Sequence, residues 1–438
     1  MGIFSKEEAK KVMEKAMSFS TADACVINLG GSESGNIRYA RNSVSTSGHQ
    51  SNQSLAVTAS FGKKSGTATI DEFDDASLEK VVKRAEELAK LAPENPEFMQ
   101  PLGPQTYDES KTYVEATANM TPEYRAQVAE SSIQPAKEND VTAAGFLDGG
   151  AGFSAMMNSN GLFAYNKSTN VEFTVTMRSN DGTGSGWVTR DFNDVSKFDA
   201  AEASKVAIDK AVMSREAKAI EPGKYTVILE PSAGLGLLEG LGRSISARSA
   251  DEGRSFMSKE GGGTKMGVKI VDERVNLWSD PLNEEVPAGT WNGEGQPLKK
   301  TSWIENGVVK NLAYDRFWAK EKGVEPVPFP SNFIMGGGDA SLEDLIKSTK
   351  KGILVTRLWY IRSVDPQTLL YTGLTRDGTF YIENGKIKYP VKNFRFNESP
   401  IIMLNNLETL GKQVRVDGSL IPYMKIRDFT FTSLSDAV

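Results

Sequence analysis

The stretch "KYTVILEPSAGLGLLEGLGRSISARS", residues 224–249, places a strand directly before a helix. Residues 225–229 bring β-branched and large apolar side chains together in a short run, which is typical of a buried strand. Pro231 and Ser232 then mark a helix start. Many α/β enzymes place their chemistry at such a junction. This helix, however, has no His and no Cys, and its one acidic side chain is Glu239.

The glycines of this helix are predicted to serve packing. A dinucleotide fingerprint needs its glycines in the turn between strand and helix, and an acidic residue after a second strand. Here Gly234, Gly236, Gly240 and Gly242 continue through the helix, and polar loop sequence follows. We therefore interpret them as allowing close contact between helix and sheet. The Gly-rich stretches at residues 259–267 and 334–341 are predicted to be flexible connections.

The composition is that of a globular cytoplasmic protein. With 438 residues the chain is long enough for two or three domains. It has no apolar run that could span a bilayer, and "FSKEEAKKVMEKAM" near the N-terminus favours an amphipathic helix over a secretory signal. Its single cysteine, Cys25, excludes an internal disulfide. The net charge of -6 disfavours general nucleic-acid binding.

The scarcity of histidine restricts the possible chemistry. The chain has one histidine, His49, and neither an HExxH nor a CxxC motif. A zinc hydrolase needs about three His, Cys or carboxylate ligands. His49 lies in the polar stretch "STSGHQSNQS" and Cys25 on another predicted strand, so neither is expected to be catalytic. We expect the scattered acidic residues between 280 and 315 to be solvated surface.

The predicted fold class is α+β, with an N-terminal α/β region of mixed sheets and long helices before a large, mainly-β C-terminal domain. Residues 1–104 form the first α/β unit, which ends in the proline-rich strap "APENPEFMQPLGP". Its predicted elements are a helix at 6–19, strands at 24–29 and 36–42, a hairpin turning at 62–66, and a helix at 76–91 capped by Asp75.

Residues 105–220 form a second α/β unit within the same N-terminal region. Thr121 is a predicted N-cap, with Pro122 at the first helical position. The unit is predicted to contain a helix ending near Pro135, strands at 141–148, 153–158, 162–166, 171–179 and 185–189, and a helix from Asp199 to near Lys218.

Residues 221–438 form the mainly-β domain. Asn306-Gly307 and Asn384-Gly385 each suit a two-residue type I′ turn, so two hairpins are expected. This part also contains five of the six tryptophans: Trp278, Trp291, Trp303, Trp318 and Trp359. Most should build the core, and some should line a groove in which an unfolded peptide binds by strand addition.

Several segments, taken in order, resemble the TldD/PmbA family, which is labelled a modulator of DNA gyrase and grouped with metallopeptidases. They are "RNSVSTSG" (41–48), "FGKKSGTATIDEFDDASLEKVVKRAEELAK" (61–90), "NSNGLFAYNKSTNVEFTV" (158–175), "SDPLNEEVPAGTWNGEGQPLKKTSWIENGVVKNLAYD" (279–315) and "YIENGKIKYPVKNFRFNES" (381–399). The resemblance covers nearly the whole chain.

The resemblance also implies a degenerate site. In the TldD branch, a His-Glu-x-x-x-His helix follows this strand, and a later cysteine completes a zinc site. By the resemblance, Glu239 stands at the first histidine, Gly240 at the glutamate and Ser244 at the second histidine. The late cysteine is missing from "VDGSLIPYM". The chain is thus similar to the PmbA/TldE branch, with no catalytic residue and no metal ligand of its own.

The resemblance implies a cytoplasmic subunit that pairs with a TldD-like metalloprotease, in which zinc binds the partner and unfolded peptides are cleaved. Two alternatives stay open. One is a stand-alone homodimer that binds a peptide or a partner without protease activity. The other is a hydrolase with an unconventional mechanism, in which carboxylates such as Glu239 act. No direct contact with nucleic acid or membrane is expected.

Overall fold

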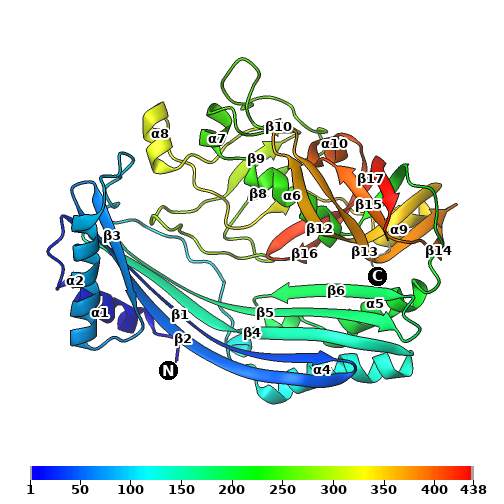
Figure 1. Cartoon of the computed structure of the whole chain (residues 1–438), viewed down its shortest axis with the longest axis horizontal. Helices are drawn as coiled ribbons and strands as arrows, with labels where there is room; N and C mark the ends of the chain where they lie inside the picture. Colours follow the sequence, from blue (N-terminus) through cyan, green and yellow to red (C-terminus); the bar gives the residue numbers. More distant parts are fainter. Residues whose placement is uncertain (1, 436–438) are drawn as a thin grey trace.

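Two β-sheets, each covered by helices, organise the computed structural model, which describes residues 2–435. Figure 1 shows a long, curved sheet below and a second body, built on the larger sheet, above it. The helices and extensive sheets confirm the predicted α+β class. Among the residues described, no helix is both long and apolar enough to cross a membrane.

The first sheet has six antiparallel strands in the order β3-β2-β1-β4-β5-β6. Residues 1–104 supply β3, β2 and β1 and residues 105–220 supply β4, β5 and β6, so the two predicted N-terminal units join through β1 and β4 into one sheet. The domain boundaries at 104 and 220 stay a prediction. The strands are β1 (Ala24–Ala40), β2 (Ser43–Phe61), β3 (Lys64–Ile70), β4 (Val141–Asn158), β5 (Phe163–Ser179) and β6 (Ser185–Phe192).

Three of these strands are longer than predicted. The predicted strand at 24–29 and most of the one at 36–42 belong to one strand, β1, while Arg41 and Asn42 form the turn to β2. The predicted pairs in residues 141–158 and 162–179 likewise form β4 and β5. Glycines such as Gly30 and Gly150 interrupt the apolar alternation, but their backbones stay paired with neighbouring strands. The separate strands were therefore wrong, because hydrogen bonding continues where side-chain patterning stops.

Helices cover the first sheet at its two ends (Figure 1). At one end α1 (Lys6–Met17) and α2 (Asp75–Leu91) pack on β1 and β2. At the other end α4 (Pro122–Glu138) and α5 (Ala200–Met213) pack on β4 and β5. The short α3 (Glu115–Ala118) and the 3₁₀ turn η1 (Val195–Lys197) complete this part.

Three predicted helix ends need correction. The N-cap of α2 is Asp74, which accepts from the N–H groups of Ala76 and Ser77, so Asp75 is the first helical residue. The helix α4 continues past Pro135 to Glu138, because Ala136 is fully buried in the core and holds the last turn in place. The helix α5 ends at Met213 and not near Lys218.

The second sheet has eleven strands, and β7 pairs with both β12 and β17, which closes the ring β7-β12-β13-β15-β17. Both Asn-Gly turns have positive φ at the two central positions, as predicted. The strands are β7 (Lys224–Leu229), β8 (Leu277–Ser279), β9 (Thr301–Glu305), β10 (Val308–Val309), β11 (Ile334–Met335), β12 (Lys351–Asp365), β13 (Leu370–Glu383), β14 (Lys386–Pro390), β15 (Phe394–Glu398), β16 (Leu407–Val416) and β17 (Ser419–Leu434).

Five helices pack on or beside the second sheet: α6 (Pro231–Arg243), α7 (Ala247–Asp251), α8 (Arg316–Lys322), α9 (Leu342–Lys347) and α10 (Pro400–Asn405). The glycines of α6 lie against side chains of other elements. A Cβ at Gly236 would lie 2.8 Å from Ile361, and one at Gly242 would lie 2.6 Å from Phe333. The predicted packing role of these glycines is confirmed.

The proline-rich strap is extended and crosses to the C-terminal part of the chain. Glu97 forms a bidentate ion pair with Arg248 at 2.7 and 2.8 Å, and Tyr107 donates a hydrogen bond to the Gly295 carbonyl at 2.7 Å. The Gly-rich segment 334–341 is not the flexible connection that was predicted. It contributes β11 to the sheet, and the Gly338 N–H donates to the Gly411 carbonyl at 2.8 Å.

Candidate functional site

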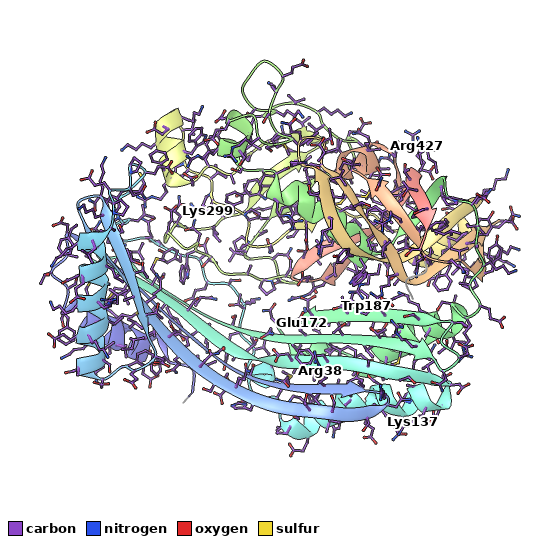
Figure 2. The ribbon with its side chains drawn as sticks, in the orientation of Figure 1. Arg38, Lys137, Glu172, Trp187, Lys299 and Arg427 are labelled. Atoms are coloured by element: carbon purple, nitrogen blue, oxygen red, sulfur yellow. The ribbon has the colours of Figure 1, made fainter. Side chains whose placement is uncertain are left out.

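One surface of α6 faces the first sheet across two adjoining cavities, which we call the α6 cleft. The first cavity, about 260 Å³, has α6 and the β16–β17 turn on one side and β5 and β6 on the other. The second, about 450 Å³, shares Trp187, Thr189 and Ser232 with the first and extends beyond the N-terminus of α6. Figure 2 shows Glu172 and Trp187 on the first sheet, directly below the C-terminal body.

The three predicted family positions do not face the cleft together. Glu239 lines it, and its carboxylate pairs with Arg243 one turn further along α6 at 3.1 Å. Gly240 is buried on another side of the helix, where a Cβ would lie 2.6 Å from Cε2 of Tyr371 and still closer to its Cζ and Oη. The Ser244 hydroxyl donates to the Leu241 carbonyl at 2.7 Å at the helix end.

These residues do not fit a zinc ion. A zinc site needs His, Cys or carboxylate donors arranged around one point. Position 239 offers a carboxylate already paired with a guanidinium, position 240 has no side chain, and the hydroxyl at 244 is engaged. Within residues 2–435, no group of three or more His, Cys, Asp or Glu side chains is arranged to hold a metal. The three family positions of this chain therefore lack the donor set that a catalytic zinc ion requires.

The first cavity is rich in carboxylates. Glu172, Asp191, Glu239 and Asp417 line it. Asp148 on β4 stands opposite Glu172 on β5, which in turn stands opposite Asp191 on β6. Burial raises the pKa of Glu172, and repulsion from Asp417, Asp191 and Asp148 raises it further. Burial also raises the pKa of Asp148. This end of the cleft therefore disfavours anions.

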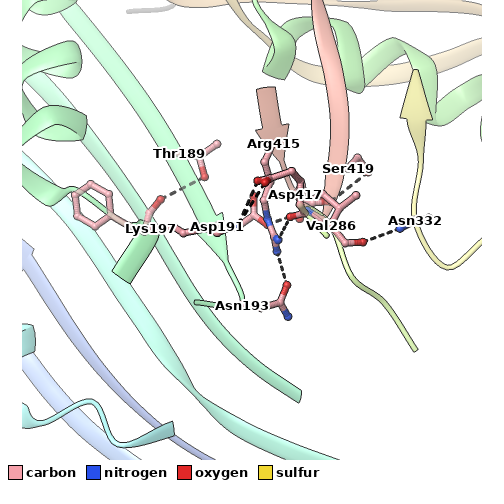
Figure 3. A network of polar contacts seen from close by, with 12 residues as sticks. Thr189, Asp191, Asn193, Lys197, Val286, Asn332, Arg415, Asp417 and Ser419 are labelled. Atoms are coloured by element: carbon pink, nitrogen blue, oxygen red, sulfur yellow. Dashed lines mark hydrogen bonds and ion pairs between the residues drawn. The ribbon is translucent and has the colours of Figure 1, made fainter. Parts of the chain in front are cut away.

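A polar network joins the first sheet to the β16–β17 hairpin at this cavity (Figure 3). Arg415 contacts Asp191 at 2.9 Å through Nε and the Asn193 Oδ1 at 3.0 Å through Nη2. The Gly418 N–H donates to the same Asp191 oxygen at 2.9 Å. The network fixes one wall of the cleft against the other. It joins residues 224 positions apart in the chain, so no local pattern indicated it.

A second connection to β6 centres on Asp377, which is 2% exposed and has the left-handed φ of 56°. Its carboxylate accepts from the Ser185 hydroxyl at 2.6 Å and from Arg357 at 3.1 Å. The Arg357 guanidinium lies over the Trp187 ring, 4.0 Å from its centroid. Burial lowers the pKa of Arg357, and Asp377 opposes this shift.

The aromatic residues that line the cleft, Trp187 and Tyr423, are not among the five tryptophans of the C-terminal half. The groove was expected to be lined by tryptophans of the C-terminal half, but Trp303 is a core residue with 1% exposure, and Trp187 of the first sheet lines both cavities. His49 is exposed beside Glu33 on β2, and Cys25 is buried with the pKa of its thiol raised by burial. Neither lines the cleft.

Two kinds of comparison place this architecture among known proteins. TldE from Thermococcus kodakarensis has a TM-score of 0.86 at 19% identity, with 97% of this chain and 99% of that chain covered. A putative modulator of a DNA gyrase from Thermotoga maritima also has a TM-score of 0.86, at 18% identity, with 97% and 100% covered. At these identities the likeness concerns the fold.

Several of the sequence relatives are curated as metalloproteases. One from Methanothermobacter thermautotrophicus is 26% identical over 287 residues, which is 60% of this chain and 61% of that protein. Metalloprotease PmbA from Escherichia coli O157:H7 is 22% identical over 215 residues, or 46% of each chain. The chain thus aligns with less than two thirds of either of these two relatives.

The fold and these relatives define a protein of the metallopeptidase-related class. Three family models match in chain order: PmbA/TldA metallopeptidase domain 1 at residues 25–89, the central domain at 101–215 and the C-terminal domain at 222–433. The chain belongs to the PmbA/TldD family.

Proposed function

We propose that this chain is a PmbA/TldE-like, non-catalytic subunit of a cytoplasmic TldD/PmbA-type metalloprotease that cleaves unfolded peptides. In this proposal a TldD-like partner binds the zinc, and this chain supplies part of the substrate chamber. The family membership supports the proposal, as does the resemblance of the chain to the branch that lacks the zinc motif.

The observation that carries the proposal is the packing at Gly240. The resemblance puts the general base of the active branch at this position. Here the position has no side chain, and Tyr371 from β13 fills the space into which one would extend. In this proposal the general base is absent, and the tyrosine ring of residue 371 packs where its side chain would begin. Glu239, paired with Arg243, is left as the only one of the three positions whose side chain lines the cleft.

The α6 cleft supports a role in holding substrate. It lies between two bodies, a frequent location of ligand sites, and its walls combine Trp187 with polar groups. The Arg415 and Asp377 connections fix β6, which is one wall of the cleft, to β16 and β13 of the C-terminal body. We infer that the cleft accepts an extended peptide segment and orients it toward the partner's active site.

Reconstitution tests the proposal. We would mix the purified chain with a TldD-like subunit that retains His-Glu-x-x-x-His and measure cleavage of an unstructured fluorogenic peptide with and without chelator. The chain alone should be inactive, the pair should be active, and chelator should abolish the activity. Glu239→Gln should leave the pair able to cleave the peptide in a chelator-sensitive way, because the residue lines the cleft but takes no part in the chemistry. Robust, chelator-sensitive cleavage by the chain alone would overturn the proposal.

A further inference from the structure

A continuous series of aromatic rings and guanidinium groups leads from the α6 cleft along one face of the β12–β13 hairpin, which lies above β6 in Figure 1. Nothing in the proposed function accounts for it. We call it the Arg–aromatic ladder, and its members are Trp187, Arg357, Arg376, Trp359, Tyr360 and Arg362.

The inner part of the ladder lies at the cleft. Trp187 lines both cavities, and the guanidinium of Arg357 lies 4.0 Å from the centroid of its ring. Arg376 stands opposite Arg357 on the neighbouring strand. Asp377 is the carboxylate near both, at 3.1 Å from Arg357 and 3.8 Å from Arg376. Asp377 therefore lies within ion-pair distance of both guanidinium groups.

The outer part continues to an exposed surface. The Arg376 guanidinium lies 4.1 Å from the centroid of the Trp359 ring, which is 5.4 Å from that of Tyr360. Arg362 lies 4.2 Å from the Tyr360 ring centroid, and within residues 2–435 it forms no ion pair with a carboxylate. The outer end of the ladder thus presents the exposed guanidinium of Arg362, on a chain whose net charge is -6.

Tyr360 is held in an unfavourable backbone conformation. Its φ is +55°, a value that a bulky side chain rarely adopts, and the pairing of β12 with β13 shifts register between Trp359 and Arg362. The residue is 58% exposed. Strained residues of this kind concentrate at functional sites. Exposed Tyr, Trp and Arg are also the residue types that dominate binding energy at protein interfaces.

We propose that the ladder binds acidic, extended peptide segments and leads them to the α6 cleft; this inference rests on the proposed function and specifies its substrate class. A guanidinium stacked by its face on a ring keeps its in-plane N–H donors for carboxylates. Arg357 and Trp359 are two residues apart on β12, so their spacing matches the alternating side chains of an extended ligand.

A peptide fits this surface better than single-stranded nucleic acid. Both ligands use aromatic platforms with arginines. However, the ladder leads to the cavity lined by Glu172, Asp191 and Glu239, where a phosphate backbone meets a row of carboxylates. A peptide can place acidic side chains on the ladder and neutral or basic ones in the cavity, whereas a nucleic acid carries a charge at every nucleotide.

Fluorescence anisotropy with the full chain tests the inference. The probes are fluorescein-labelled dodecapeptides of Glu-Ser, Gln-Ser and Lys-Ser repeats, with an oligo-dT strand as the nucleic-acid probe. We expect the Glu-Ser peptide to bind most tightly and the Lys-Ser peptide most weakly. Arg362→Gln and Tyr360→Gly should each weaken Glu-Ser binding about fivefold. Glycine suits the φ of residue 360, so this variant should keep the fold.

Arg427→Gln is the matched control, since Arg427 is also an exposed arginine (Figure 2) but does not belong to the ladder; its binding should equal that of the wild type. Equal binding of the three peptides, no effect of the ladder variants, or tighter binding of oligo-dT would each overturn the inference. Cleavage by the reconstituted pair would still uphold the proposed function. Ladder-dependent peptide binding without any activity of the pair would support the ladder and count against the proposed function.

Discussion

Replacing Gly240 with alanine isolates the contact between α6 and Tyr371. In an open helix position the substitution should stabilise the protein by about 0.8–1.0 kcal/mol, because alanine has the higher helix propensity. Here the new Cβ would lie 2.6 Å from Cε2 of Tyr371 and closer still to its Cζ and Oη. Tyr371 is nearly buried, and its ring is rigid, so the ring or the helix must move.

Overpacking of this kind costs about 1–3 kcal/mol. After the propensity gain, Gly240→Ala should leave the free energy of unfolding between unchanged and about 2 kcal/mol lower. The sharper quantity is the coupling free energy. In a Tyr371→Ala background the clash is gone, so Gly240→Ala should be stabilising there, and the two backgrounds should differ by about 1–3 kcal/mol.

Urea denaturation followed by circular dichroism would give the four midpoints of this double-mutant cycle. Gly234→Ala is the control on the same helix: its Cβ would overlap only the terminal methyl of Met424, which can rotate away, so it should not show the loss. If Gly240→Ala stabilised the protein as much as Gly234→Ala does, or if the coupling with Tyr371→Ala were zero, Tyr371 would not occupy this position in the way described.

Three further predictions concern the walls of the cleft. Asp377→Asn should lower stability by about 1–3 kcal/mol, because the half-buried guanidinium of Arg357 loses its carboxylate partner, and thermal unfolding measures the loss; a change near zero would contradict the pairing. Arg415→Gln should loosen β6 from the β16–β17 hairpin, which hydrogen exchange would report as faster exchange of the Gly418 amide, and unchanged exchange would refute the connection. Glu172→Gln should stabilise the protein at neutral pH, since the folded state raises the pKa of Glu172 and so disfavours its charged form. This gain should disappear below the ordinary pKa of glutamate, where the residue is protonated in both states, and a gain independent of pH would contradict the repulsion.

The elements that sequence predicted well are those fixed by local chemistry. The Thr121 cap, the two Asn-Gly turns and the strand before α6 each depend on a few adjacent residues, and all were found where expected. Strand lengths were underestimated because backbone pairing continues through the glycines of β1 and β4. Hydrophobic periodicity depends only on the side chains, so a strand that is predicted from it ends where the alternation ends.

The candidate site was predictable only in part. The sequence indicated that the α6 glycines serve packing, but it gave no means to identify Tyr371 as the side chain beside Gly240. The pairs Asp191–Arg415 and Ser185–Asp377 join the two bodies across 224 and 192 positions. Neither partner of such a pair differs in sequence from an ordinary surface charge or hydroxyl. Only the fold shows that they are brought together.

The packing of α6 against Tyr371 also limits which side chains position 240 can accept. Introducing a glutamate at position 240 would require more room than the alanine does, and Tyr371 already excludes the first carbon of any side chain there. Moving Tyr371 in turn disturbs the core in which α6 and β13 pack. A catalytic base at this position therefore needs at least two coordinated changes, one on the helix and one on the strand. We expect Gly240→Glu alone to destabilise the protein without producing any peptide cleavage.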